Sequence, residues 1–164
     1  MPNYLLGLGS SHINACSFIQ RAYLLLDNTA RINIKSTSDI YFSPSQNCIS
    51  ACRFANAVLL VETTYTPHLF LQNTHLIESK LGRRRVQKNS PRTIDIDILW
   101  SPEVKINAST LKIPHGSFFK RDFTIILAIQ ALKRDLALVP KTFMTAKMAL
   151  LPQSKLRTPD QSQS

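Results

Sequence analysis

The sequence predicts an α+β fold built on a mostly antiparallel sheet, and three observations support this assignment. Segments with strand-like and helix-like patterns follow one another in the order β-α-β-β-α-β, which is the split βαβ arrangement. The chain has 164 residues, enough for one domain with its own core. Hydrophobic residues make up 44% and charged residues 18%, a balance typical of chains that fold. We expect one domain over residues 1–150 and a disordered tail over residues 151–164.

The chain begins with a strand followed by a helix. The apolar run Tyr4–Leu8 predicts a short buried strand. The overlapping Gly7-Leu8-Gly9-Ser10 begins like a dinucleotide-binding fingerprint, but the third glycine of that motif is missing. We therefore expect a tight strand-to-helix turn, with Ser10 or Ser11 near the helix cap. An apolar stripe then predicts a helix over Ile13–Asn28.

The middle of the chain adds two strands and a second helix. Isoleucines at positions 32, 34 and 40 predict a strand that ends at Ser43-Pro44, and Phe54–Val61 predicts a longer one. Thr66-Pro67 opens a helix with a capping threonine followed by proline, and Gly82 closes it. Within this helix the residues expected to face the core are Leu69, Leu76 and Ile77.

The following part of the chain predicts a strand, a hairpin and a helix. In PRTIDIDIL, residues 91–99, isoleucine alternates with aspartate, which is the period-2 pattern of a strand with one apolar face. Trp100–Asn107 predicts a turn and a hairpin return, and Leu111–Pro114 a further extended segment. Phe123–Leu132 is apolar and predicts a helix packed on the sheet.

Asp95 and Asp97 are the first candidates for chemistry. Residues at i and i+2 of a strand share a face roughly 6.5–7 Å apart, so the two carboxylates stand side by side. They repel each other unless a cation is near, and aspartate disfavours strands. A solvated strand face explains most isolated Asp-x-Asp pairs, but the cationic residues beside this pair favour a metal site. Mg²⁺ takes one or two carboxylates together with water and phosphate oxygens, and two ions about 3.5–4 Å apart could be held by such a pair.

A basic loop precedes the acidic strand. It contains Arg83, Arg84, Arg85 and Lys88, and Arg92 follows at the start of the strand. Alone, this run is equally well explained as a solvated charge run or a nucleic-acid patch. Next to a metal-binding strand it is better explained as a phosphate clamp, because arginine binds phosphate oxygens bidentately and keeps its charge.

Other candidate residues lie in a loop and in the predicted core. His115 and Arg121 are six residues apart in and after a loop, and both could reach phosphates. Phe54 and Phe123 are core residues by default, although each could stack on a flat heterocycle. Asn56, next but one to Phe54, could read the hydrogen-bonding edge of that heterocycle.

The bulk properties limit the partners and the compartment. Lys and Arg number 20 against 10 Asp and Glu, a formal net charge of +10, which favours anionic partners without choosing among them. The N-terminal residues have no signal-peptide pattern, and no apolar stretch is long enough to span a bilayer. Three cysteines without a Cys-x-x-Cys pair do not build a disulfide framework. We therefore expect a soluble cytoplasmic protein.

The chain resembles one enzyme family from about Tyr4 to Leu132. The motifs that carry the resemblance are GLGSS, Phe54-Ala55-Asn56-Ala57, ESKLGRRR from Glu78 to Arg85, PRTIDIDIL and IPHGSFFKRDF. The family is that of the 6-hydroxymethyl-7,8-dihydropterin pyrophosphokinases of folate biosynthesis. The resemblance implies a three-layer α/β/α sandwich on a ferredoxin-like core. It also implies an ATP-dependent diphosphotransferase that moves diphosphate from ATP to the pterin hydroxymethyl group and releases AMP.

The resemblance further implies roles for individual residues. Asp95 and Asp97 match the ligands of two Mg²⁺ ions. Arg83 and Arg92 match arginines, in a mobile loop and at the strand start, that assist the transfer. The positions that match ATP contacts are Glu78, Arg85, Arg92, Ile98, His115 and Arg121. The positions that match the pterin pocket, in which two aromatic rings sandwich the heterocycle, are Ser43, Pro44, Phe54, Asn56, Asp95 and Phe123.

Departures from the family pattern leave alternatives open. Ser11 replaces the usual asparagine, Gly116 replaces an aromatic residue, and Asn89-Ser90 stand where a tryptophan is often found. They motivate a second hypothesis, a relative that binds nucleotide or pterin without turnover. The charge and the strand order motivate a third, a basic RNA-binding module, although the aromatic-rich strand signature of such modules is missing. Under the favoured enzyme hypothesis the partners are ATP and the pterin, without nucleic acid or membrane, and the protein is a monomer.

Overall fold

The computed structural model describes residues 1–44, 53–83 and 92–133. Its elements in chain order are β1 (Asn3–Ser10), α1 (Ala15–Asp27), β2 (Ile32–Thr37), β3 (Tyr41–Pro44), β4 (Arg53–Thr63), α2 (Pro67–Lys80), β5 (Asp95–Trp100), β6 (Ile106–Asn107), β7 (Lys112–Ile113), the 3-10 helix η1 (Phe118–Lys120) and α3 (Asp122–Leu132). Most of the predicted loop over 45–53, most of the basic loop over 83–88 and the predicted tail over 151–164 lie outside the described ranges.

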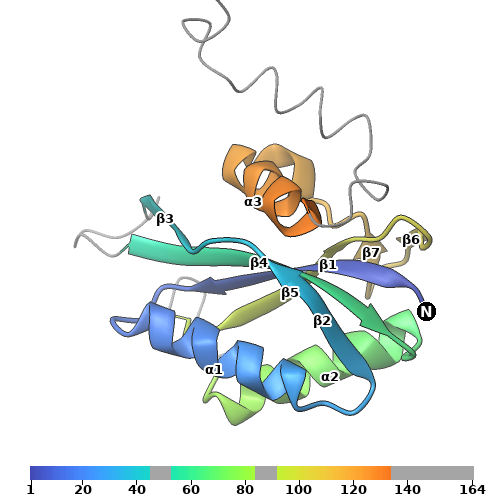
Figure 1. Cartoon of the computed structure of the whole chain (residues 1–164), viewed down its shortest axis with the longest axis horizontal. Helices are drawn as coiled ribbons and strands as arrows, with labels where there is room; N and C mark the ends of the chain where they lie inside the picture. The colour runs from blue at the N-terminus through green and yellow to red at the C-terminus, as the bar shows by residue number, and fades with distance from the viewer. Residues whose placement is uncertain (45–52, 84–91, 134–164) are drawn as a thin grey trace, which may run out of the picture.

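One antiparallel sheet forms the centre of the described structure. Its strands follow the order β2-β4-β1-β5, and β3 pairs with the N-terminal part of β4 beyond the end of β2. All of these pairings are antiparallel. α1 and α2 cover one face of the sheet, and α3 lies on the opposite face (Figure 1). The predicted combination of helices with an antiparallel sheet is confirmed. None of the described helices is long and apolar enough to cross a membrane.

The two faces of the sheet carry separate apolar clusters. The cluster under α1 and α2 includes Ile96 and Ile98 of β5. The cluster under α3 includes Leu5 of β1. Because side chains alternate along a strand, Asp95 and Asp97 point to the same face as α3. The sequence prediction that these two residues share a face opposite the isoleucines is therefore confirmed.

β1 is longer than the sequence predicted. Gly7 and Gly9 lie inside the strand and pair with both β4 and β5, so the expected turn at these glycines is wrong. α1 begins at Ala15, and Asn14 takes the N-cap position that was predicted for a serine. The reason is tertiary: strands on both sides supply partners for the glycine backbone, and the local sequence does not reveal those neighbours.

The buried face of α2 also differs from the prediction. Leu69 and Leu76 are 45% and 59% exposed, so their assignment to the core is wrong, whereas Ile77 is buried as expected. Two of the buried residues of α2 are polar, so the positions of the apolar residues alone did not identify the buried face correctly. The buried residues of α2 are Phe70, Thr74, Ile77 and Glu78.

The predicted hairpin forms later in the chain than expected. β6 pairs with β7 in a small separate sheet, with Ile106 opposite Ile113, and does not return along β5. The backbone N–H of His115 then donates to the carbonyl of Leu99 at 2.8 Å, which fixes the following loop against the end of β5. α3 follows within one residue of the predicted bounds.

Candidate active site

A row of four residues crosses the sheet on the face shared with α3. Tyr41 of β3 lies opposite Asn56 of β4, Asn56 lies opposite Gly9 of β1, and Gly9 lies opposite Asp95 of β5. Directly opposite residues of an antiparallel pair share a face, with Cβ atoms about 4.5–5.5 Å apart. The row therefore runs from an aromatic ring through an amide and a strand position without a side chain to a carboxylate.

The glycines of β1 form the floor between the amide and the carboxylates. A Cβ atom at Gly9 would lie 3.1 Å from Cε1 of Phe54, and one at Gly7 would lie 3.0 Å from a methyl carbon of Leu99. Phe54 and Leu99 thus lean over the bare strand from its two sides. Both glycines are required by close packing here, since neither has an unusual backbone angle.

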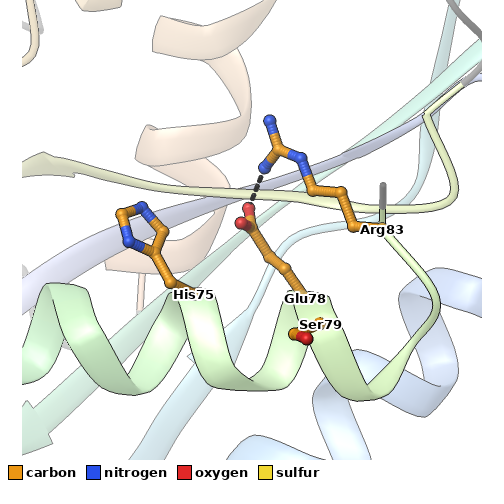
Figure 2. Close-up of a pocket in the computed structure, with 4 residues that line it drawn as sticks. All are labelled: His75, Glu78, Ser79 and Arg83. Carbon is orange, nitrogen blue, oxygen red and sulfur yellow. Dashed lines mark hydrogen bonds and ion pairs between the residues drawn. The ribbon is translucent and has the colours of Figure 1, made fainter. Parts of the chain in front are cut away.

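Arg83 connects α2 with the acidic strand. Its guanidinium forms ion pairs with Glu78 of α2 and, at 2.6 Å, with the Oδ1 atom of Asp95. Figure 2 shows Arg83 reaching back over the helix to the Glu78 carboxylate. The same carboxylate accepts a hydrogen bond from the backbone N–H of Ile96 at 2.7 Å. Glu78 therefore fixes α2 to β5 and holds Arg83 beside Asp95.

A pocket opens next to this ion pair. It has a volume of about 290 Å³, and His75, Glu78, Ser79 and Arg83 line it. His75 and Glu78 rise from the same side of α2, and the Arg83 side chain closes the pocket opposite them (Figure 2). The pocket thus combines a helix surface with a buried carboxylate and a cation.

We expect Glu78→Gln to gain stability relative to the unmodified protein as the pH rises. Burial raises the pKa of the Glu78 carboxyl above its usual value near 4.5, although the hydrogen bond from Ile96 and the charge of Arg83 oppose the shift. The folded state then binds this proton more tightly than the unfolded chain, so wild-type stability falls from about pH 4.5 upward through the raised pKa. Denaturant unfolding at a series of pH values measures the difference. A difference that stays flat or shrinks with pH contradicts the prediction.

Arg92 approaches Asp95 from the other side. Its Nη1 atom lies 2.5 Å from the Oδ2 atom of Asp95, while Arg83 contacts Oδ1. The two arginines therefore bind the two oxygens of one carboxylate. Arg92 is half-exposed, with 51% of its side chain accessible, so its ion pair with Asp95 has a small effect on stability. Its main effect is to orient the Asp95 carboxylate.

Asp97 has a different environment from Asp95. Burial raises the pKa of the Asp97 carboxyl, and repulsion from Asp95 raises it further. The positive charges of His115, Arg83 and Arg121 act in the opposite direction. Among the described residues no hydrogen-bond donor lies on the Asp97 carboxylate, whereas both oxygens of Asp95 are paired with arginines.

These two carboxylates fit the requirements of Mg²⁺. The ion prefers oxygen ligands, needs only one or two carboxylates and takes the rest from water and phosphates. A cation next to Asp97 would also relieve the repulsion between Asp95 and Asp97 that raises the pKa. Among the described residues, no three acidic, histidine or cysteine side chains are placed so that they could hold a metal ion together.

Polar and aromatic residues gather at the other end of the row. The Asn56 amide nitrogen donates to the Ser43 hydroxyl at 3.1 Å and to the Phe54 carbonyl at 3.0 Å, which fixes the orientation of the amide. The ring of Phe123, in the first turn of α3, stacks on Tyr41 with 5.5 Å between centroids and 16° between planes. This end of the row thus combines a fixed amide with aromatic faces.

The structure brings together most of the predicted site residues. Arg83, Arg92 and Asp95 form one ion-paired cluster, and His115 and Arg121 lie within electrostatic reach of Asp97. Ile98 is separate from this cluster, because its side chain is 2% exposed and packs in the core on the opposite face. Arg85 lies outside the described residues. Pro44 is the last residue of β3, opposite Arg53.

Two residues of the site were missed by the sequence analysis. Tyr41 stands two positions before Ser43, so the strand period could have placed it on the same face. Gly7 and Gly9 are two positions apart, which is the spacing of neighbouring residues on one face of a strand, so the pair could have predicted a strand face without side chains. The pair was instead assigned to a turn.

The fold and this site define a class of protein. Two carboxylates on one strand, with several cationic side chains around them, suit an enzyme that transfers phosphoryl groups, in which positioning and charge neutralisation do most of the work. The sequence matches the family model for 7,8-dihydro-6-hydroxymethylpterin-pyrophosphokinase over residues 5–133. The chain belongs to this family, and it is therefore an enzyme of the pyrophosphokinase class.

Similar proteins agree with this assignment, and a solved structure shares the fold. The chain is 31% identical over 129 residues to the 2-amino-4-hydroxy-6-hydroxymethyldihydropteridine pyrophosphokinase of Helicobacter pylori. The matched region covers 77% of this chain and 79% of the relative. The chain is 34% identical over 125 residues to the enzyme of the same name from Aquifex aeolicus, covering 76% and 77%. A crystal structure of an HPPK-DHPS protein in complex with substrates shares the fold, with a TM-score of 0.60 and 15% identity. That match covers 90% of this chain and 43% of the solved chain.

Proposed function

We propose that this protein transfers diphosphate from ATP to the hydroxymethyl group of 6-hydroxymethyl-7,8-dihydropterin and releases AMP. The hydroxymethyl oxygen bonds to the β-phosphorus of ATP, the bond from that phosphorus to the oxygen bridging to the α-phosphorus breaks, and the hydroxyl proton is lost. Family membership supports the reaction class, and relatives carry the corresponding name. The observation that carries the proposal for the site is the pair Asp95 and Asp97 with arginines on both oxygens of Asp95.

Asp95 and Asp97 are the proposed ligands of two Mg²⁺ ions that enter with ATP. When bound, the ions supply positive charge to the phosphate oxygens and lower the pKa of the acceptor hydroxyl. The part played by the protein is to hold two oxygen-bearing side chains on a rigid strand, at a spacing set by the pleat. No separate general base is assigned, and His115 is proposed as a phosphate contact.

The arginines are proposed to neutralise charge on the transferring group. Arg83 and Arg92 already point at Asp95, so phosphates bound next to this carboxylate would meet both guanidinium groups. Arg121 and His115 would contact the remaining phosphates, with Arg85 as a further ATP contact. The nucleoside is proposed to occupy the pocket beside Glu78, whose carboxylate contacts the backbone of β5 at Ile96.

The pterin is proposed to lie along the row between Asn56 and Asp95. Asn56 would read its hydrogen-bonding edge, Phe54 and Phe123 would stack on its faces, and Ser43 and Pro44 would complete the pocket. The glycine floor supports this proposal, because the missing side chain at Gly9 lets the Phe54 ring lie close to β1, where it could stack on a flat ring. The hydroxymethyl group would then point toward Asp95.

We further propose the finer properties that the resemblance implies. The sheet and helices would belong to a ferredoxin-like core in a three-layer α/β/α sandwich. The protein would act as a cytoplasmic monomer on ATP and the pterin, without nucleic acid or membrane. Residues 1–150 would form the single pyrophosphokinase domain.

Gly9→Val is expected to weaken pterin binding selectively. The new side chain would fill the floor and push the Phe54 ring into the proposed ring site, and overpacking of this kind costs about 1–3 kcal/mol. The KM for the pterin should rise on the order of tenfold. Gly116→Val is the matched control, because a Cβ there meets nothing within 4 Å. Steady-state kinetics at saturating ATP measure the KM for the pterin in both variants. Equal effects of the two variants would contradict the proposed role of Gly9 in the pterin site.

The decisive experiment mixes the protein with ATP, Mg²⁺ and the reduced pterin alcohol and follows nucleotides by chromatography. AMP should accumulate in step with the pterin diphosphate, and only when the pterin is present. Accumulation of ADP, or no nucleotide turnover at all, overturns the proposal. Salt-sensitive RNA binding without any response to nucleotide would favour the basic binding module instead.

A further inference from the structure

Two hydrogen bonds join Ser11, directly after β1, to Arg92, which lies three positions before the first residue of β5. The backbone N–H of Ser11 donates to the carbonyl of Arg92 at 3.1 Å, and the backbone N–H of Arg92 donates to the hydroxyl oxygen of Ser11 at 2.9 Å. The buried Ser10 hydroxyl also donates to the Arg92 carbonyl, at 3.3 Å. These residues are about eighty positions apart, so the bonds are tertiary contacts that fix the Arg92 backbone.

The side chain of Arg92 needs such an anchor. It is 51% exposed, and a long exposed side chain keeps many rotamers that packing does not restrict. Its guanidinium nevertheless meets the Oδ2 atom of Asp95 at 2.5 Å. A fixed backbone reduces the positions that the guanidinium can reach, and thereby favours the contact with Asp95.

We propose that Ser11 is a positioning residue, whose hydroxyl fixes the Arg92 backbone so that the guanidinium meets Asp95 and the transferring phosphates. The inference rests on the proposed function, because that function gives Arg92 its role. Small displacements of a group that contacts the transition state are costly, on the order of a hundredfold in rate for 1 Å. A serine that touches no substrate can therefore affect the rate through Arg92.

The first test compares three variants by steady-state AMP formation. Ser11→Ala removes the acceptor of the Arg92 N–H, and kcat should fall about tenfold while the KM for the pterin changes less than about twofold. Ser11→Thr keeps the hydroxyl and should retain most of the rate. Ser38→Ala is the matched control, because its hydroxyl also accepts a backbone N–H at 2.9 Å, from Val58, away from Arg92. Equal losses in Ser11→Ala and Ser38→Ala overturn the inference.

The second test asks whether Ser11 acts through Arg92. In a protein that already carries Arg92→Ala, adding Ser11→Ala should lower kcat by less than about twofold, since the group it positions is gone. A further loss as large as that seen in the wild-type background means that Ser11 acts elsewhere, and overturns the inference.

The third test uses no substrate and no metal. Amide hydrogen exchange followed by NMR should show faster exchange at Arg92 in Ser11→Ala than in the wild type and in Ser38→Ala. Unchanged exchange at Arg92 overturns the inference even if the rate falls. If the wild-type protein forms no AMP, the proposed function fails, and faster exchange still supports the hydrogen bond from Arg92 to Ser11.

Discussion

Asp97→Ala is expected to remove nearly all formation of AMP while the protein remains folded. The variant loses one of two carboxylates that face the same side of β5, and with it a proposed ligand for the charge next to the phosphates. Removing one group that stabilises developing charge in a transition state costs about 10²–10³-fold in kcat, and a lost metal ligand should reach the upper end of that range. Single-turnover assays with saturating ATP and Mg²⁺ measure the loss.

Substitution of Asp97 should leave the free energy of unfolding nearly unchanged or raise it, although activity falls. Burial and the neighbouring Asp95 raise the pKa of the Asp97 carboxyl, so the ionised group is less favourable in the folded protein than in the unfolded chain. Asp97→Asn, which keeps the shape, should therefore unfold at the same or a higher denaturant concentration at neutral pH. A site residue that is needed for chemistry and unfavourable for folding is a common compromise in enzymes.

An exposed aspartate on the opposite side of the sheet provides the control. Asp27 ends α1, and Asp27→Ala should leave AMP formation unchanged. Retained AMP production in Asp97→Ala contradicts the role assigned to this carboxylate. Loss of activity accompanied by loss of the folded state would instead make Asp97 a structural residue.

Arg83→Ala is expected to slow the transfer far more than it weakens pterin binding. The guanidinium pairs with the buried Glu78 and with Asp95, which is the end of the row farthest from the Asn56 amide that is proposed to hold the pterin. The rate constant of the chemical step should fall on the order of 10²–10³-fold, while the dissociation constant of the pterin changes by less than about threefold. Rapid-quench measurements and calorimetry separate the two quantities.

A lysine in place of Arg83 sharpens the comparison. The single Nη1 atom of Arg83 contacts both Glu78 and Asp95. Arg83→Lys keeps one charge there but lacks the further guanidinium N–H groups that bind phosphate oxygens bidentately, so it should restore stability better than rate. Arg83→Ala leaves the Glu78 carboxylate buried without its cation and should lower the free energy of unfolding. Equal losses of rate and pterin affinity in Arg83→Ala would mean that the arginine only binds substrate.

The acidic face of β5 and most of the element order follow from patterns along the chain. The single strand predicted from Ile32 to Pro44 is wrong, because β2 and β3 are separate strands that pair with different parts of β4. The alternation of isoleucine with Asp95 and Asp97 determines which side of a strand each occupies, because the side-chain period of a strand is two. The start of α2 at Pro67 follows from the fixed backbone angle of proline, which suits the first turn of a helix, whereas the Thr66 side chain makes no capping hydrogen bond. Features of this kind depend only on residues close in sequence, so they can be predicted from the sequence.

Other features of the site depend on neighbours that only the folded chain supplies. Gly9 became a strand residue because β4 and β5 both pair with it, and Leu69 became exposed because α2 turns a partly polar face to the sheet. The Glu78 carboxylate meets the Ile96 backbone across 18 positions, and Ser11 meets Arg92 across 81. Periodicity records which face a residue occupies, whereas the partner on that face is set by strand order and helix docking. The sequence by itself therefore determined the candidate ligands, and the tertiary structure decided which residues orient them.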